Sequence, residues 1–253
     1  MTEAQSLWFP FVKPQEQARL RLFCFPYAGG GATVFRTWQE DLGPEVEVCA
    51  VQLPGRETRF REAPHRAMGP LADALVPVLE PLLDKPYAVA GYSMGAAVAH
   101  EVALRLTERG RPPEHFFACA RTSPLLPPDF PVYEDTTDDD IWRRLRDLGG
   151  MPAATLDNPE LRELVLPQLR ADLELNFTYR PRSARPHDCP VTAFGGRADA
   201  GVTEEEVRAW AEVTRGPFRV RLFDGDHFFL REDGGDLLAE IRADLGAVLA
   251  HRP

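Results

Sequence analysis

The chain has 253 residues, of which 44% are hydrophobic and 9% aromatic, and its formal net charge is -10 at pH 7. These values are typical of a folded globular protein with one or two domains and exclude a disordered chain. The negative charge argues against nonspecific nucleic-acid binding, which needs a basic surface. No apolar run reaches the ~20 residues that span a bilayer, and the first residues lack a signal-peptide pattern. We therefore expect a cytoplasmic protein that binds neither nucleic acid nor membrane.

Short apolar segments with strand character alternate with helical patterns along the chain. The strand-like segments are 20–27, 46–54, 87–93, 115–122, 189–196 and 218–225. The helical patterns between and after them are 33–42, 68–83, 94–110, 203–214 and 236–252. Nearly continuous apolarity in most of the strands indicates that both of their faces are covered. The alternation predicts an α/β fold in which helices cover both faces of a mostly parallel central sheet.

Residues 123–186 interrupt this alternation. They contain two further helical patterns, 137–150 and 158–177, between the fourth and fifth strands. Pro167 lies inside the second pattern, where we expect it to kink the helix. An insertion of this kind in a single domain of residues 1–253 can be a lid over a site at the strand ends, or only a packed subdomain. We expect a lid.

The cysteines give no sign of a metal or redox site. None of the four belongs to a C-x-x-C pair, and most lie among apolar residues of the expected strands. A free cysteine in such surroundings behaves as a small buried hydrophobe. We expect reduced core residues and no metal or cofactor; the four are Cys24, Cys49, Cys119 and Cys189.

One segment is locally basic despite the acidic total. The stretch "PGRETRFREAPHR" contains Arg56, Arg59, Arg61 and Arg66. Clustered arginines can bind an acidic partner, but they are as often a solvated loop. The sequence leaves both interpretations open.

A serine lies at the junction of the third strand and its helix. Gly91-Tyr92-Ser93-Met94-Gly95 fits the G-x-S-x-G nucleophile elbow, in which a sharp strand-to-helix turn holds the serine in a strained conformation. Glycine on both sides permits the close backbone approach that such a turn needs. The turn also places the hydroxyl at a helix N-terminus, where free N–H groups favour negative charge. We predict that Ser93 is a catalytic nucleophile.

A serine nucleophile needs a base, and in this type of fold the partners follow in the order serine, acid, histidine. His227 comes just after the last strand, in "RLFDGDHFFL", where a loop can carry it over the sheet. The other histidines precede a suitable acid, lie along the elbow helix or belong to the C-terminal tail; they are His65, His100, His115, His187 and His251. His227 is therefore the predicted base.

The acid is expected in the loop after the preceding strand. Asp199 in "FGGRADAGV" occupies that loop. Asp224 and Asp226 are rivals because they neighbour His227, but residues so near the histidine point elsewhere. We predict that Asp199 orients the imidazole and stabilises its cation.

Two backbone donors are needed for an oxyanion hole. One is the amide that follows the nucleophile, on Met94. The other should come from the glycine-rich loop after the first strand, "FPYAGGGATVF", unless that loop is only a connection. We predict Ala28 as this second donor.

Together these blocks resemble the type II thioesterases of polyketide and nonribosomal peptide biosynthesis. The similarity covers nearly the whole chain and rests on "FCFPYAGGGATVFRTW", "VQLPGRETRFRE", "AGYSMGA", "FGGRADAGV" and "FDGDHFFL". It implies an α/β-hydrolase fold with a helical lid. Two positions depart from the family pattern. Tyr92 replaces a common histidine and should face away from the nucleophile, whereas "ARTSPLLPP" leaves the acyl pocket undefined.

The resemblance also implies a function and a partner. Such enzymes hydrolyse acyl groups from the phosphopantetheine thiol of an acyl or peptidyl carrier protein, which clears stalled or wrongly loaded synthases. A carboxylesterase or acyltransferase would use the same residues, and a non-catalytic carrier-binding relative would lack one of them. None of the expected residues is missing here. The acyl chain and the partner synthase are left open, and we expect a monomer.

Overall fold

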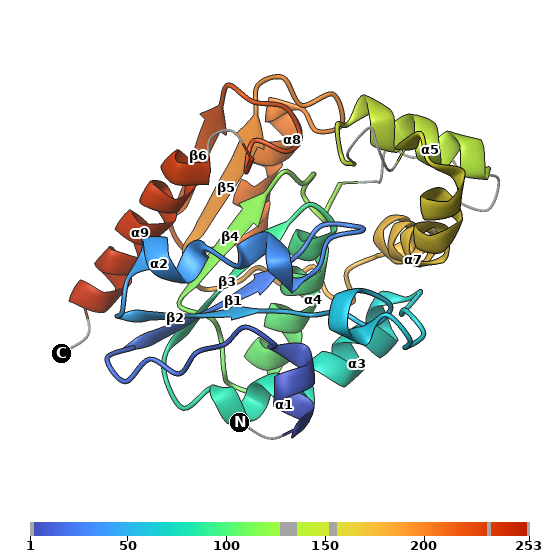
Figure 1. Ribbon diagram of the computed structural model, residues 1–253. Coiled ribbons are helices and arrows are strands. Elements are labelled where there is room, and N and C mark those ends of the chain that lie inside the picture. Colours follow the sequence, from blue (N-terminus) through green and yellow to red (C-terminus); the bar gives the residue numbers. More distant parts are fainter. Residues whose placement is uncertain (1–2, 127–135, 152–155, 232–233, 252–253) are drawn as a thin grey trace.

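The computed structural model describes residues 3–126, 136–151, 156–231 and 234–251 (Figure 1). In these residues six strands form one sheet in the order β2-β1-β3-β4-β5-β6, and every pair is parallel. The strands are β1 (Leu20–Phe25), β2 (Val46–Ala50), β3 (Tyr87–Tyr92), β4 (His115–Cys119), β5 (Val191–Gly196) and β6 (Phe218–Phe223). The parallel sheet expected from the sequence is confirmed, with all six segments in place.

Helices connect the strands and cover the sheet. The α-helices are α1 (Glu3–Trp8), α2 (Trp38–Leu42), α3 (Met68–Leu79), α4 (Met94–Glu108), α5 (Asp138–Asp147), α7 (Pro159–Thr178), α8 (Glu204–Arg208) and α9 (Gly234–Ala250). Short 3-10 helices are η1 (Ala32–Phe35), η2 (Glu57–Arg59), η3 (Glu80–Leu82) and η5 (Ala209–Val213). In the part of the chain that is described, no helix combines the length and apolarity needed to cross a membrane.

Strands β1 to β5 send alternate side chains to two separate cores, as the period of a strand requires, while β6 at the edge has exposed arginines on one face. On β1, Phe23 and Phe25 join the core under α3 and α4, while Leu22 and Cys24 join the core under α2 and α9. All four side chains are buried. This two-sided burial explains why β1 is apolar at every position except Arg21 rather than alternating.

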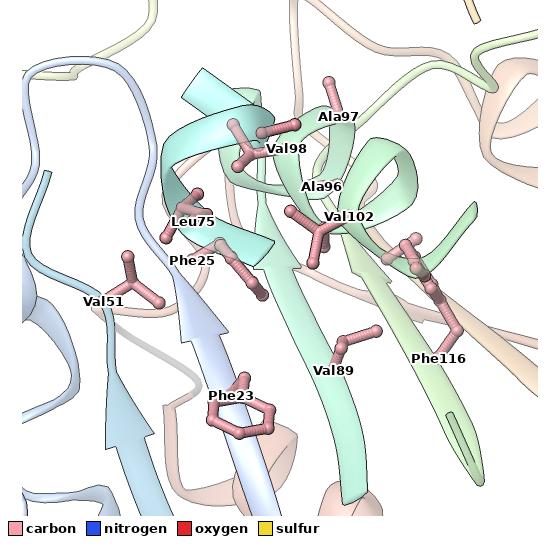
Figure 2. Packing of buried hydrophobic residues seen from close by; sticks show 14 of the residues in the cluster. Phe23, Phe25, Val51, Leu75, Val89, Ala96, Ala97, Val98, Val102 and Phe116 are labelled. Carbon is pink, nitrogen blue, oxygen red and sulfur yellow. The ribbon is translucent and has the colours of Figure 1, made fainter. Parts of the chain in front are cut away.

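The first core holds the elbow helix tightly against the sheet. Figure 2 shows small and β-branched side chains of α4 packed over the strands, among them Ala96, Val98 and Val102. Phe25 and Val89 meet them from β1 and β3. Alanines at the start of α4 let its backbone approach the strands closely.

The strand order places the functional loops next to one another. From β1 the chain crosses to β2 at one edge and then returns to β3 on the other side of β1. Loops that leave neighbouring strands on opposite sides of the sheet form a crevice at their carboxyl ends, which is where ligands bind in open α/β sheets. The loop after β1 and the turn after β3 therefore lie at the same point.

The predicted insertion forms a small helical layer of its own. Helices α5 and α7 lie together, apart from the layers that cover the sheet (Figure 1). Thr137 caps α5 and Asn158 caps α7, and α7 continues through Pro167. The layer has a separate core: Ile141, Trp142, Leu145, Leu156, Leu169 and Leu173. Residues 127–135 and 152–155 of the insertion lie outside the described residues.

Several helical details differ from the sequence prediction. The pattern over 68–83 is divided into α3 and η3, and η2 was not expected. Helix α1 was not expected, and the pattern over 33–42 is divided into η1 and α2. Phe35 ends η1 and Trp38 begins α2, and their rings meet edge to face with centroids 4.8 Å apart. The pattern over 203–214 is likewise divided, into α8 and η5.

The four cysteines are free thiols in the core, as predicted. All of them are buried, and none forms a disulfide. Burial raises the pKa of Cys24, Cys49, Cys119 and Cys189, because a thiolate loses its hydration in an apolar interior.

Candidate active site

Ser93 occupies the turn between β3 and α4 with a strained backbone. Its φ is 51° and its ψ is -117°, a region that L-residues rarely adopt. The neighbouring glycines have no room for a side chain. A Cβ on Gly91 would overlap the backbone of Ala96, and a Cβ on Gly95 would overlap the carbonyl of Phe25. The glycines therefore permit the tight turn that exposes the Ser93 hydroxyl to the crevice.

His227 lies in the loop after β6 and reaches the serine. Its Nε2 is 3.1 Å from Ser93 Oγ, within hydrogen-bond distance. The backbone of His227 is held in place, because the Tyr92 hydroxyl donates a hydrogen bond of 2.7 Å to its carbonyl. Tyr92 thus contacts the histidine backbone from the core. This support was not foreseen from the sequence.

Asp199 completes a chain of three side chains. Its Oδ2 lies 2.8 Å from His227 Nδ1, and the carboxylate is completely buried. The other oxygen, Oδ1, accepts the backbone N–H groups of Gly201 and Val202 at 2.8 and 3.2 Å. These hydrogen bonds compensate the buried charge and fix which oxygen faces the histidine.

The rival acids and the other histidines lie elsewhere. Asp224 is exposed and pairs with Arg197, and Asp226 accepts the N–H of Phe228. His100 contacts the Tyr179 hydroxyl, and His115 contacts Thr192, in each case inside the protein. The structure brings together the serine, acid and histidine that the sequence analysis selected.

The loop after β1 is a tight turn beside Ser93. The N–H of Gly30 donates to the carbonyl of Tyr27 at 2.9 Å, and Gly29 adopts a φ of 81°. Ala28 lies inside this turn and lines the same cavity as Ser93. Met94 is the first residue of α4, so its amide is one of the N–H groups that the helix itself leaves free. Both predicted oxyanion donors flank the serine.

A cavity of about 180 Å³ opens next to the serine. The sheet side contributes Ser93 and His227, together with Ala120 and Arg121 at the end of β4. The opposite wall comes from α5 and α7: Ile141, Arg144, Leu145, Leu173, Asn176 and Phe177. The insertion therefore faces the reacting hydroxyl across an apolar space with a few polar groups.

Residues 20–245 match the family model described as a thioesterase domain. The chain belongs to the thioesterase family. It is a hydrolase that acts on thioesters, and its α/β-hydrolase fold is shared with solved thioesterases.

Two solved structures and one curated relative show the branch of the family. GrsT, the gramicidin S biosynthesis protein of Aneurinibacillus migulanus, is 38% identical over 244 residues, which are 96% of this chain and 95% of GrsT. RedJ, the thioesterase of the prodiginine pathway in Streptomyces coelicolor, is 43% identical with a TM-score of 0.83, covering 94% of this chain and 92% of RedJ. BorB, the type II thioesterase from the borrelidin cluster, is 35% identical with a TM-score of 0.82, covering 93% of this chain and 96% of BorB. The resemblance to type II thioesterases is confirmed.

Two arginines of the basic segment in this thioesterase are buried rather than solvated. Arg56 and Arg59 are only 4% and 7% exposed. Arg59 pairs with Glu62 at 2.6 Å, and Arg56 pairs with Asp172 of α7 at 2.7 Å. Sequence reasoning singled out the segment but missed Asp172, which carries no local signal in its helix.

Proposed function

We propose that this thioesterase hydrolyses acyl groups from the phosphopantetheine thiol of carrier proteins in nonribosomal peptide or polyketide synthesis. Ser93 is the nucleophile, His227 the base and Asp199 the residue that orients the base. The observation that carries the proposal is the pair of contacts on the imidazole, 3.1 Å to Ser93 Oγ and 2.8 Å to Asp199 Oδ2. The pathways named for GrsT, RedJ and BorB support the carrier-bound substrate.

The first half of the reaction forms an acyl-enzyme. Neutral His227 accepts the hydroxyl proton at Nε2 while Ser93 Oγ attacks the thioester carbonyl. The amides of Ala28 and Met94 donate hydrogen bonds to the resulting oxyanion. The carbon–sulfur bond then breaks, and the thiol leaves with the proton held by His227. Asp199 stabilises the imidazolium that exists between the two proton transfers.

The second half releases the acid. Water enters where the thiol left and gives one proton to His227 Nε2 as its oxygen attacks the ester carbonyl. The same two amides bind the second oxyanion. Collapse breaks the bond to Ser93 Oγ, and His227 returns the proton to the serine. The free acid and the starting enzyme result, and no cofactor takes part.

The cavity supports an acyl site of modest size. An apolar protein cavity of about 150 Å³ holds one benzene molecule, and the cavity beside Ser93 measures about 180 Å³. Its walls are mostly apolar, with Ile141, Leu145 and Leu173 among the lining residues. We expect short acyl chains to fit without movement of the protein.

The insertion, residues 123–186, acts as a lid within a single domain of residues 1–253. Its helices supply the wall of the cavity that faces the sheet, and they have a hydrophobic cluster of their own. A layer with its own core can move relative to the sheet, and Leu175 near the end of α7, which joins the core under α3 and α4, is where this layer stays attached. The cytoplasmic location and the monomeric state stay predictions.

The test compares a thioester and an oxygen ester of the same acyl chain. A carrier protein loaded with a short acyl group and the p-nitrophenyl ester of the same acid are given to the enzyme, and released acid is measured. We expect the carrier thioester to be hydrolysed with the higher kcat/KM and Ser93→Ala to lower turnover by at least about 10⁴-fold. Preference for the oxygen ester would indicate a carboxylesterase. Undiminished turnover in Ser93→Ala would refute the nucleophile.

A further inference from the structure

A buried ion pair joins the basic segment to the lid. Arg56 Nη1 lies 2.8 Å from Asp172 Oδ2, and Nη2 lies 2.7 Å from Oδ1, so the pair is bidentate. The side chains are only 4% and 2% exposed. A buried ion pair contributes little net stability, because desolvation of the two charges opposes their attraction. Its place in the fold therefore needs a reason other than stability.

Both partners also bind the turn that carries Ala28. Asp172 Oδ2 accepts the backbone N–H of Gly29 at 2.7 Å. Arg56 Nη1 donates to the backbone carbonyl of Gly30 at 3.2 Å. The remaining donors of the guanidinium also have acceptors, since Nε and Nη2 both donate to the carbonyl of Pro54 at 3.2 Å. The ion pair thus holds two peptide groups of the turn, the one before Gly29 and the one after Gly30.

These contacts determine where the Ala28 amide points. The N–H of Ala28 and the carbonyl of Tyr27 belong to one planar peptide group and point in opposite directions. The carbonyl accepts the N–H of Gly30 at 2.9 Å, inside the turn. The Ala28 N–H is consequently directed out of the turn, provided that Gly29 and Gly30 keep their orientations. The clamp on those two glycines supplies that condition.

We propose that Arg56 and Asp172 are positioning residues that orient the Ala28 N–H toward the oxyanion. Through Asp172, this orientation depends on the position of α7. The inference rests on the oxyanion role given to Ala28 in the proposed function. An oxyanion donor acts by being held in place before the reaction, so a loose turn weakens binding of the transition state more than binding of the substrate. Because Asp172 belongs to α7, a shift of the lid would change the direction of the Ala28 N–H.

The central variant replaces both charges by apolar side chains of similar size, Arg56→Met with Asp172→Leu. Such replacements of buried ion pairs are often neutral or stabilising. Removal of one oxyanion donor costs about 10²- to 10³-fold in kcat. For a donor that is only misaligned we expect kcat to fall about 10- to 100-fold, with KM changed less than about threefold. The melting temperature should fall by a few degrees, because Gly29 N–H and the carbonyls of Gly30 and Pro54 lose their side-chain partners.

A boronic acid gives a readout that does not depend on the substrate. Ser93 Oγ bonds to the boron of a short alkyl boronic acid, its proton passes to His227, and one boron oxygen takes the position of the oxyanion. Affinity for this tetrahedral adduct should fall by the same factor as kcat. Affinity for the corresponding carboxylic acid product should stay the same, because the product carries no tetrahedral oxyanion.

A second buried ion pair serves as the matched control. Arg21 of β1 pairs with Glu47 of β2, with side chains 10% and 6% exposed, at the end of β1 opposite the turn. Arg21→Met with Glu47→Leu should leave kcat and boronate affinity as they are in the wild type. An equal loss in this control would overturn the inference, because the loss would then follow from removing any buried pair.

Asp172→Asn provides a variant of nearly the same shape. The amide has one acceptor oxygen where the carboxylate has two. With that oxygen at the Oδ2 position, Gly29 and Arg56 Nη1 keep their acceptor and Arg56 Nη2 faces an NH₂ group; in the flipped orientation Gly29 and Arg56 Nη1 face it instead. We expect kcat and boronate affinity to fall about 5- to 20-fold. Wild-type boronate affinity in both Asp172→Asn and the double variant would overturn the inference. Absence of carrier hydrolysis by the wild type would refute the proposed function instead, while the boronate comparison would still report on the turn.

Discussion

The two carboxylate oxygens of Asp199 have different partners. Oδ1 accepts two backbone N–H groups, from Gly201 and Val202, and Oδ2 faces His227. An asparagine at this position has only one oxygen, and the two N–H donors require it at the Oδ1 position. Its NH₂ group would then face His227 Nδ1, and the ring would be forced to carry its proton on Nε2, the nitrogen that must accept the serine proton.

Asp199→Asn should therefore lower kcat for thioester hydrolysis by about 10⁴-fold, with the fold intact. The measurement is steady-state hydrolysis of a loaded carrier protein together with thermal unfolding. Asp224→Asn is the matched control, since Asp224 is exposed and lies near His227 in the sequence. If Asp224→Asn lost activity and Asp199→Asn kept it, the acid would be assigned wrongly.

Much of the site could be predicted residue by residue because its parts follow strand ends. Ser93 comes directly after a strand, Asp199 and His227 come in the short loops that follow two other strands, and the glycines beside Ser93 indicate the tight turn. The Arg56–Asp172 pair could not be found in this way. Its partners are 116 residues apart, and neither position in the sequence shows that the other is near.

At the scale of elements, α5 and most of α7 share a small core of their own, and Leu175 near the end of α7 joins the main core. Trp142 of α5 is 4% exposed within the small core of the insertion, and the Arg162 guanidinium lies over its ring, 4.8 Å from the centroid. Trp142 does not line the cavity beside the serine. A change at this residue should loosen the insertion without touching the reacting groups.

Trp142→Ala should raise amide hydrogen exchange in α5 and α7, while β3 and α4 keep their protection. Replacing a buried tryptophan by alanine lowers stability by about 3 to 5 kcal/mol, and we expect the insertion to lose this stability. Trp38→Ala, which removes a similarly buried ring from a main core, should instead destabilise the whole protein. Equal exchange increases in α4 and α7 of Trp142→Ala would show that the insertion does not open separately.

Elements with strong patterns were predicted well, and those held by packing alone were not. All six strands could be read from apolar runs, and Asn158 marked the start of α7. The pattern over 33–42 did not show the division into η1 and α2, at which Phe35 and Trp38 pack together. Helix α1 has six residues and is too short for a periodic signal.

At the scale of the whole molecule, buried neutral histidines link stability to pH. His187 is 1% exposed, stacks on Phe116, and neither of its ring nitrogens has a hydrogen-bond partner among the described residues. Burial lowers the pKa of His187 to about 4, against a smaller opposing effect of Asp188. Burial also lowers the pKa of His115 to about 4, and that of His100 well below its usual value.

The unfolded chain therefore binds more protons than the folded protein between about pH 6.5 and pH 4. The free energy of unfolding should fall as the pH drops through this window, by about 3 kcal/mol for a histidine such as His187. His187→Phe keeps an aromatic ring and should make this fall smaller by about that amount. Urea unfolding at pH 7, 5.5 and 4.5 measures the difference. Parallel curves for the variant and the wild type would contradict the assignment.

The covalent intermediate tests the central claim most directly. The enzyme is mixed with a carrier protein that bears a short acyl-phosphopantetheine, the reaction is quenched within one turnover, and the digested enzyme is weighed by mass spectrometry. The account predicts that the peptide containing Ser93 gains the mass of the acyl group and that Ser93→Ala gains none. An acyl group found on another residue, or carrier hydrolysis by Ser93→Ala at the wild-type rate, would contradict it.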